Sequence, residues 1–194
     1  MPEGRPSRIV LASQSPRRLE LLQQIGITPE VLPADIDESV KQDESPEDYV
    51  RRMATEKAAA LKLTDEALIL AADTSVVLDK DIFGKPENKS DFMRMMNLLS
   101  GRTHQVLTAV ACRFNLWRSC QLSKTDVTFR PLSDAVIEQY WATGEPVDKA
   151  GGYAVQGKGA VFVTHINGSY SGVMGLPLYE TSELISDAMN RDPS

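Results

Sequence analysis

The sequence has few of the residues that build disulfide-rich or zinc-stapled proteins. It contains two cysteines and two histidines in 194 residues. Two cysteines cannot form a disulfide framework, and neither His104 nor His165 stands at the spacing of a structural zinc site. We therefore expect Cys112 and Cys120 to be reduced thiols and the fold to depend on its hydrophobic core.

The sequence also has no excess of positive charge. The chain has 21 Lys and Arg against 27 Asp and Glu, a net charge of −6 at pH 7. An acidic protein gains nothing electrostatically from DNA or anionic lipid, so we expect neither nucleic acid nor membrane as a partner. The basic residues that matter for function are expected to gather locally, in a pocket.

The sequence also lacks an uninterrupted apolar run long enough to cross a membrane. The longest stretch without Asp, Glu, Lys or Arg, residues 159–179, could span a bilayer by length, but glycine, proline, asparagine and histidine interrupt it. No apolar segment typical of a signal peptide stands near residue 1. We therefore expect a soluble, cytoplasmic protein.

Length and composition favour one ordinary globular domain. Hydrophobic residues make up 42% and charged residues 25% of the chain, so we expect a single domain over residues 1–194, with residues 1–7 flexible. Strand and helix patterns alternate in the first half, and antiparallel hairpins follow. This order predicts an α/β layered domain with a mixed sheet. The expected strands are 8–12, 28–32, 67–72, 75–78, 82–83, 104–114 and 120–129, and the expected helices are 16–25, 46–63, 90–99, 133–142 and 178–189.

The first candidate binding feature is the junction between the first strand and the first helix. Ser13 and Ser15 precede Arg17 and Arg18, and Pro16 suits the first helical position. A helix N-terminus presents unpaired N–H groups and partial positive charge, so these hydroxyls and one of the arginines could complete an anion cradle. The alternative is a capped helix with surface arginines.

Two lysines stand in positions that suggest an anionic ligand. Lys57 shares one helix face with Val50, Met53 and Ala54, where a lysine is costly unless it snorkels or meets an anion. Lys85 lies in a Gly-Lys-Pro turn. This stiff turn could hold the ammonium group of the lysine in a fixed position. Either lysine taken alone also fits an ordinary structural position.

Carboxylates complete the set. Asp73 directly follows the apolar run ALILAA, at the expected carboxyl end of a central strand, where ligands of α/β sheets gather. Thr74 could turn toward the same cleft, and Glu38 lies in an acidic cluster after the second strand. Cations that neutralise phosphate oxygens, together with carboxylates that hold Mg²⁺ or Mn²⁺, predict phosphoryl chemistry.

One apparent motif does not fit its usual function. Residues 152–159 match the P-loop pattern GxxxxGK, but Gly159 stands where the loop needs Ser or Thr, and no strand pattern leads into it. We predict instead a glycine-rich loop that approaches a base or sugar closely. Gln156 in this loop carries an amide donor and acceptor suited to a pyrimidine edge.

Nine ordered motifs give a resemblance to a known family. They are LASQSPRR (11–18), DE (37–38), EKA (56–58), AADT (71–74), GKP (84–86), LSGRTHQV (99–106), DKAGGYAVQG (148–157), INGSY (166–170) and GLPL (175–178). From residue 9 to about residue 185 the chain resembles the Maf family of nucleotide pyrophosphatases. The resemblance implies a layered α/β fold like that of inosine triphosphate pyrophosphatases, with a twisted mixed sheet and a cleft between two lobes, often in a homodimer.

The resemblance also implies an activity and site roles. The family hydrolyses nucleoside triphosphates to the monophosphate and pyrophosphate with a divalent cation, Mg²⁺ or Mn²⁺. Its catalytic base falls on Asp73, and its other characteristic charged positions fall on Glu38, Lys57 and Lys85. We expect Glu38 and Asp73 to position the metal, and the triphosphate to be held by Ser13, Ser15, Arg17, Lys57 and Lys85.

Three positions divide the family by substrate. Arg17, Thr74 and Gln156 match the branch that acts on dTTP and UTP, and that branch could extend to modified pyrimidines such as 5-methyl-UTP. Two alternatives stay open at this point. One is house-cleaning of modified purine nucleotides, and the other is a nucleotide-binding regulator of septum formation.

Overall fold

The architecture is a mixed sheet with helices on both faces. A computed structural model describes residues 5–63 and 66–190. Within these ranges seven strands form one sheet in the order β2-β1-β3-β5-β6-β7, with β4 paired to β3. The strands are β1 (Arg8–Leu11), β2 (Glu30–Val31), β3 (Ala67–Leu78), β4 (Asp81–Phe83), β5 (Thr103–Phe114), β6 (Trp117–Phe129) and β7 (Val163–Asn167). β1 runs parallel to β2 and β3 and the other pairs are antiparallel, which confirms the predicted mixed α/β sheet.

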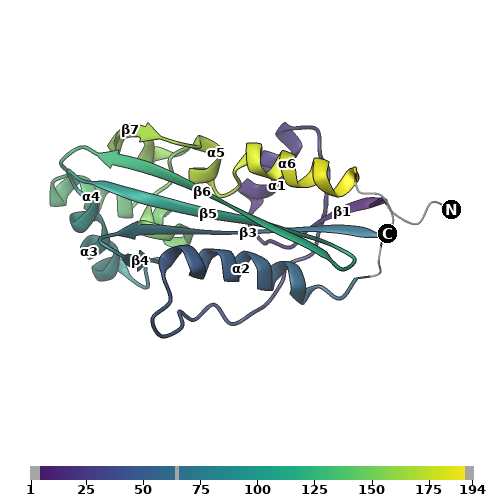
Figure 1. The fold of residues 1–194 in the computed structure, drawn as a ribbon. Helices are drawn as coiled ribbons and strands as arrows, with labels where there is room; N and C mark the ends of the chain where they lie inside the picture. Colours follow the sequence, from purple (N-terminus) through teal and green to yellow (C-terminus); the bar gives the residue numbers. More distant parts are fainter. Residues whose placement is uncertain (1–4, 64–65, 191–194) are drawn as a thin grey trace.

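The helices divide between the two faces of the sheet. They are α1 (Pro16–Gln24), α2 (Pro46–Ala60), α3 (Lys89–Leu99), α4 (Asp134–Trp141), α5 (Tyr170–Met174) and α6 (Leu178–Met189). α2 lies along one face and α1 and α6 lie on the other, while α3 and α4 gather at the far end (Figure 1). Three short 3₁₀ turns, η1 (Glu145–Asp148), η2 (Ala150–Gly152) and η3 (Lys158–Phe162), connect α4 to β7. In the described ranges every helix is too short or too polar to cross a membrane.

Most helix boundaries follow local chemistry. Ser45 caps α2 by accepting a hydrogen bond from the backbone N–H of Asp48, as the sequence predicts. The helix ends before the predicted boundary because the backbone of Leu61 turns extended. Arg113 on β5 donates to the carbonyls of Ala58 and Leu61, which satisfies acceptors that the ended helix leaves unpaired.

The prediction for the strand around Asp73 is wrong in one respect. Asp73 does not follow the end of its strand, because β3 continues through it to Leu78 and pairs with β5 from Ile69 to Val77. β-branched residues after Asp73 favour this extension. The opposite edge of β3 is bare between Leu70, the last residue paired with β1, and Val76, the first paired with β4. The cleft described below opens at this gap.

The core falls into three clusters that follow the alternation of side chains along β3. Odd-numbered residues of β3 pack against α2, where they contact the side of the helix that carries Val50 and Ala54. On the other face, one cluster joins Leu70 to α1 and α6, and another joins Val76 to α3, α4 and the 3₁₀ turns. Between these last two clusters the same face carries polar side chains, including the fully buried Thr108.

The two cysteines are free thiols, as predicted. Cys120 lies opposite Ala111 in the β5–β6 register, so it shares that residue's face of the sheet. Cys112, the next residue along β5, faces the α1–α6 side. The strand alternation thus separates the two thiols. Of residues 1–7, for which we expect flexibility, residues 1–4 lie outside the described ranges.

Candidate active site

A cleft of about 780 Å³ opens along the bare edge of β3. The segment between β1 and α1, the 34–38 loop, β3, the 84–85 turn and residues 148–156 form its walls. All nine residues that the sequence singled out line this one cleft: Ser13, Ser15, Arg17, Glu38, Lys57, Asp73, Thr74, Lys85 and Gln156. Segments up to about 140 residues apart in the sequence therefore share one site.

A lysine between two carboxylates lies at the α2 side of the cleft. The Lys57 Nζ is 2.7 Å from Asp73 Oδ1 and 2.7 Å from Glu38 Oε1. The Lys57 and Asp73 side chains are 11% and 12% exposed, whereas Glu38 is 59% exposed. Charges buried this deeply need partners, so each of the two inner groups depends on the other.

Tyr49 holds the segment that carries Glu38, and the sequence analysis missed it. Its hydroxyl donates to the backbone carbonyl of Glu38 at 2.9 Å. Burial, followed by the nearby charges of Asp73 and Glu38, raises the pKa of Tyr49 to about 12, so the phenol stays a donor. A signal was present in the sequence, because residues 49, 53 and 57 share a helix face.

The two neighbouring arginines of the first helix have different positions. Arg18 is half-buried and donates to Ser13 Oγ at 3.1 Å, to Thr74 Oγ1 at 3.3 Å and to the Gly175 carbonyl at 2.8 Å. Burial lowers the pKa of the Arg18 guanidinium, and the charge of Asp73 opposes that shift. Ser13 also accepts from the Ser15 backbone N–H at 3.1 Å. Arg18 thus ties three walls of the cleft together.

Arg17 faces the opposite wall instead. Its guanidinium lies 3.6 Å from the carboxylate of Asp148, which also pairs with Lys149. Lys85 is exposed at the cleft and forms no ion pair with any residue in the described part of the chain. Sequence reasoning quoted residues 148–157 as a motif but did not identify Asp148 as a partner of Arg17. The residue pattern at the start of a helix does not indicate which distant residue will pair with an arginine there.

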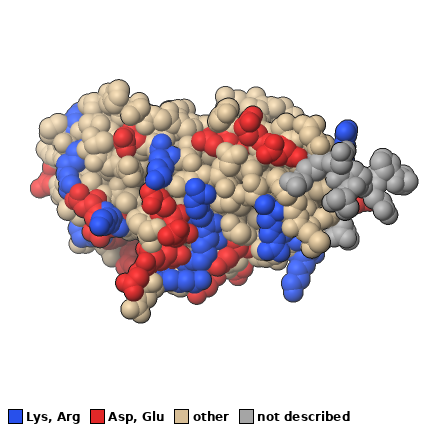
Figure 2. Space-filling model, in the orientation of Figure 1, with Lys and Arg blue, Asp and Glu red and all other residues tan. Residues whose placement is uncertain are grey.

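The cleft differs in charge from the protein as a whole. Among the residues that line it, five are Lys or Arg and four are Asp or Glu, in a chain whose net charge is −6. On the face seen in Figure 2, acidic and basic side chains are interspersed, without a broad positive patch. The local gathering of cations agrees with the expectation from the sequence, and it suits a small anionic ligand more than a nucleic acid.

Packing within the protein explains the first two glycines of the glycine-rich segment, and the predicted approach of the loop to a base or sugar stays a prediction. A Cβ on Gly151 would lie 2.8 Å from a methyl of Val76, and one on Gly152 would lie 2.8 Å from the ring of Phe92. Both glycines also have positive φ, at 67° and 74°. They let the loop pack against the protein core, so close approach to a ligand is not what these two require. Gln156 follows them and is exposed at the cleft.

A buried histidine, His104, contacts the glycine-rich loop through Tyr153. His104 Nε2 lies 2.8 Å from the hydroxyl of Tyr153, and its Nδ1 has no hydrogen-bond partner within the described ranges. Burial lowers the pKa of His104 to about 4. The imidazole is therefore neutral at physiological pH and packs edge-on against Phe129 and Tyr153.

We expect this histidine to make the fold acid-sensitive. As the pH falls below about 6.5, the ordinary pKa of histidine, His104 becomes protonated in the unfolded chain but stays neutral in the folded chain until about pH 4. The free energy of unfolding should therefore decrease as the pH is lowered from about 6.5 to about 4, by about 3 kcal/mol at most. Urea unfolding at several pH values, with His104→Gln as the comparison, measures this contribution. An equally steep fall in the variant would show that His104 is not responsible.

The carboxylates of the cleft suit a hard divalent cation. In residues 5–63 and 66–190 no group of three or more His, Cys, Asp and Glu side chains could hold a metal by itself. Glu38 and Asp73, however, converge on one ammonium, and the second oxygen of each has no bond to any other described residue. Mg²⁺ and Mn²⁺ are commonly bound by one or two carboxylates together with substrate phosphates and water. The donor set therefore fits such an ion when a polyphosphate is present.

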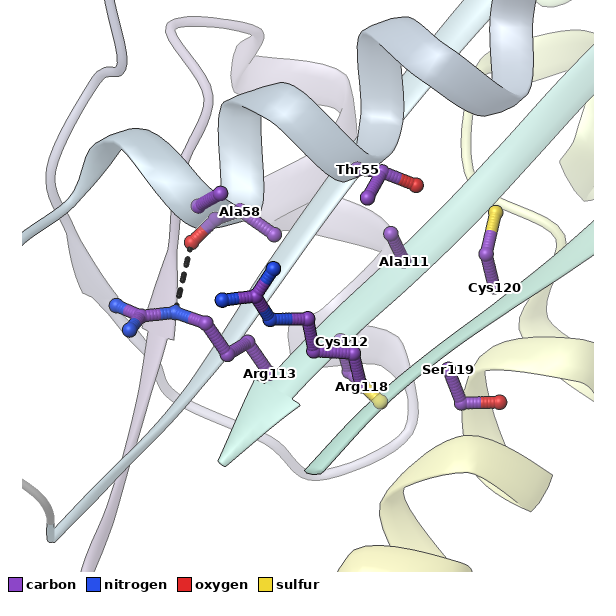
Figure 3. A pocket seen from close by; sticks show the side chains of 9 residues that line it. Thr55, Ala58, Ala111, Cys112, Arg113, Arg118, Ser119 and Cys120 are labelled. Carbon is purple, nitrogen blue, oxygen red and sulfur yellow. Dashed lines mark hydrogen bonds between the residues drawn. The ribbon is translucent and has the colours of Figure 1, made fainter. Parts of the chain in front are cut away.

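A second, smaller cavity lies between the C-terminal half of α2 and the adjoining ends of β5 and β6. It measures about 150 Å³, and Thr55, Ala58, Cys112, Arg118 and Cys120 are among the residues that line it (Figure 3). No carboxylate is among its lining residues. It therefore lacks the paired cations and carboxylates that distinguish the larger cleft.

Comparisons with known proteins point to the same chemistry. The model of the family described as Maf-like protein matches residues 8–188. A dTTP/UTP pyrophosphatase of Pseudoalteromonas atlantica is 54% identical over 92% of this chain and 95% of the relative. One of Chromobacterium violaceum is 51% identical over 93% of this chain and 94% of the relative. A solved HAM1 protein from Coxiella burnetii, at 16% identity, covers 92% of this chain and 98% of its own with a TM-score of 0.52, and this match shows the fold.

Proposed function

This chain belongs to the family of Maf-like proteins, and we propose that its cleft hydrolyses dTTP and UTP to the nucleoside monophosphate and pyrophosphate. One observation carries the proposal. A single cleft brings the buried Lys57–Asp73 pair and Glu38 together with the Ser13–Arg18 segment and Lys85. Phosphoryl transfer needs mainly positioning and charge neutralisation, which this set supplies.

The cationic and hydroxyl groups hold the polyphosphate. Ser13, Ser15 and Arg17 stand at the start of α1, where backbone N–H groups point outward. Lys85 faces them from another wall of the cleft, and Lys57 lies beside the carboxylates. Negative charge on the phosphates is thereby neutralised from several directions.

Asp73 is the general base of the proposed reaction. It accepts a proton from a water aimed at the α-phosphorus, while the Lys57 ammonium, 2.7 Å away, holds its carboxylate in orientation. Glu38 and Asp73 would hold Mg²⁺ or Mn²⁺, which supplies charge neutralisation and a more acidic water when bound. Tyr49 fixes the backbone at Glu38, so the second carboxylate stays near the first.

The base of the nucleotide is read by side chains on two walls of the cleft. We assign Thr74, Gln156 and Arg17 to substrate selection, because Thr74 and Gln156 approach the cleft from different walls and carry polar atoms that suit a pyrimidine edge. A cytoplasmic location and a homodimer fit this function and stay predictions.

A pyrophosphate-release panel tests the proposal. dTTP, UTP, ITP and 7-methyl-GTP are compared with Mg²⁺ and with Mn²⁺, and the nucleotide products are identified by chromatography. We expect dTTP and UTP to be the best substrates, and Gln156→Ala to reduce their advantage over ITP by about fivefold, since a lost hydrogen bond is worth about 1 kcal/mol. Faster turnover of ITP or 7-methyl-GTP by the wild-type protein, or release of orthophosphate in place of pyrophosphate, would contradict the proposal.

A further inference from the structure

The glycine-rich segment contains a tight turn that carries Gln156. The backbone N–H of Gly157 donates to the carbonyl of Ala154 at 3.2 Å, so residues 154–157 form a β-turn with Gln156 as the third residue. Val155, the second residue of the turn, is buried, whereas Gln156 is exposed at the cleft. The backbone of this turn therefore decides where the amide of Gln156 lies.

A tyrosine of α4 holds the first end of the turn. The Tyr140 hydroxyl accepts a hydrogen bond from the backbone N–H of Ala154 at 3.1 Å and donates its own proton to Glu145 Oε1 at 2.6 Å. Burial, followed by the hydrogen bond to Glu145, raises the pKa of Tyr140 above its ordinary value. The phenol therefore keeps the proton that it donates.

The carboxylate of Glu145 holds the segment that follows the turn. Its Oε2 accepts from the backbone N–H of Lys158 at 2.9 Å, and its Oε1 accepts from that of Gly159 at 3.1 Å. Burial opposes ionisation of Glu145, but the hydrogen bonds from Tyr140 and from these two N–H groups lower the pKa of its carboxyl below the ordinary value. In the stretch that matches the P-loop pattern, residues 152–159, an anion of the same chain thus binds the backbone N–H groups.

Two glycines of the same stretch make room for these contacts. A Cβ on Gly157 would lie 2.6 Å from the carboxyl carbon of Glu145, and one on Gly159 would lie 2.8 Å from the hydroxyl oxygen of Tyr140. Gly157 has a φ of −114°, which other residues also adopt. The close approach of the Glu145 carboxylate, and not the backbone conformation, therefore requires glycine at position 157.

We propose that Glu145, together with Tyr140, is a positioning residue for substrate selection, because the pair anchors the backbone on both sides of Gln156 and so holds its amide toward the base. Neither Glu145 nor Tyr140 is among the residues that line the cleft, so both act through the turn. A side chain that is held in place before binding loses less conformational entropy when the ligand arrives. The inference rests on the proposed function, because it takes Gln156 to contact the pyrimidine.

Glu145→Gln tests the inference with little change of shape. Glutamine replaces one acceptor oxygen with an NH₂ donor, which then faces a backbone N–H, so one anchor of the segment is released. KM for dTTP should rise about fivefold, which corresponds to about 1 kcal/mol. Because a loosened Gln156 weakens binding in the ground state and the transition state alike, kcat should stay within about twofold. The kinetic constants for ITP should also stay within about twofold.

A double-mutant cycle distinguishes positioning from general damage. Gln156→Ala alone should raise KM for dTTP about fivefold, and adding Glu145→Gln should raise it no further, because the side chain to be positioned is gone. Effects that multiply in the double variant would mean that Glu145 acts independently of Gln156, and they would overturn the inference. An unchanged KM in Gln156→Ala would overturn it together with the assignment of Gln156 to the base.

Glu138→Gln is the matched control. Glu138 lies on α4, as Tyr140 does, and its carboxylate pairs with Lys89 at 2.9 Å. The variant makes the same chemical change on a carboxylate that does not bind the glycine-rich segment, so KM and kcat for dTTP should match the wild type. An equal rise of KM in Glu138→Gln and Glu145→Gln would overturn the inference in favour of a general effect of lost charge.

Gly157→Ala keeps the test decisive if Glu145→Gln folds poorly. The added methyl displaces the flexible end of the Glu145 side chain and should raise KM for dTTP in the same way. A wild-type KM in Gly157→Ala, measured beside a raised KM in Gln156→Ala, would overturn the inference. If the wild-type protein releases no pyrophosphate from dTTP, the proposed function itself fails; if it does, and Gln156→Ala raises KM while Glu145→Gln does not, only the role of Glu145 fails.

Discussion

Asp73→Asn is expected to lower kcat for pyrophosphate release from dTTP by about 10²–10⁴-fold, the range for loss of a positioned general base. Asparagine has nearly the same shape but cannot take a proton from water at neutral pH. Its amide oxygen can still accept from the Lys57 ammonium 2.7 Å away, but the charge attraction between the two groups is lost. Steady-state kinetics with a coupled pyrophosphate assay measures the effect.

A surface carboxylate of the same strand–turn unit provides the control. Asp79 follows β3, pairs with Arg102 at 2.6 Å and has a φ of 51°, which asparagine tolerates. Asp79→Asn should retain kcat within about twofold and a similar melting temperature, because surface changes usually alter stability by less than about 0.5 kcal/mol. Turnover of Asp73→Asn within fivefold of the wild type, with the fold intact, would refute the role of Asp73 as base.

Lys57→Met is expected to change catalysis and metal binding in opposite directions. Removing one preorganised charge from a cleft should lower kcat/KM for dTTP by about 10²–10³-fold. The same change removes the ammonium that lies 2.7 Å from both Glu38 and Asp73. In the absence of nucleotide, the affinity for Mn²⁺ should therefore rise by at least about tenfold, which corresponds to about 1.4 kcal/mol. Titration calorimetry or electron paramagnetic resonance of free Mn²⁺ reads this affinity directly.

Lys85→Met is the matched control for the metal measurement. It removes a cation from the same cleft, but one that contacts no carboxylate in the ranges the structure describes. The variant should weaken binding of dTTP and leave nucleotide-free Mn²⁺ affinity within about twofold, since exposed charges at longer range are screened. A rise in Mn²⁺ affinity as large as that of Lys57→Met would show that general charge, and not the Lys57 position, governs the metal site.

The sequence predicts elements well where local chemistry determines them. Leu178–Met189 forms α6 as predicted, and the capping signal at Ser45 marks the start of α2. The five-residue α5 was missed, because so short a helix carries too little periodic pattern. The length of β3 was underestimated because pairing with β5, a partner distant in the sequence, extends it.

The site was predictable to the extent that each residue is unusual where it stands. Lys57 on an apolar helix face and Asp73 within a buried strand violate local expectations, and they prove to be each other's partners. Arg18 does not, because an arginine in the first turn of a helix is common. Its contact with the Gly175 carbonyl joins segments far apart in the chain, which no local pattern specifies.

A crystal structure with α,β-methylene-dTTP and Mg²⁺ tests the central claim most directly. The account predicts the triphosphate at the Ser13–Arg18 segment and Lys85, the pyrimidine ring beside Thr74, and the α-phosphorus facing Asp73. A nucleotide bound in the smaller cavity beneath α2, or one whose phosphates lie away from Asp73, would contradict it.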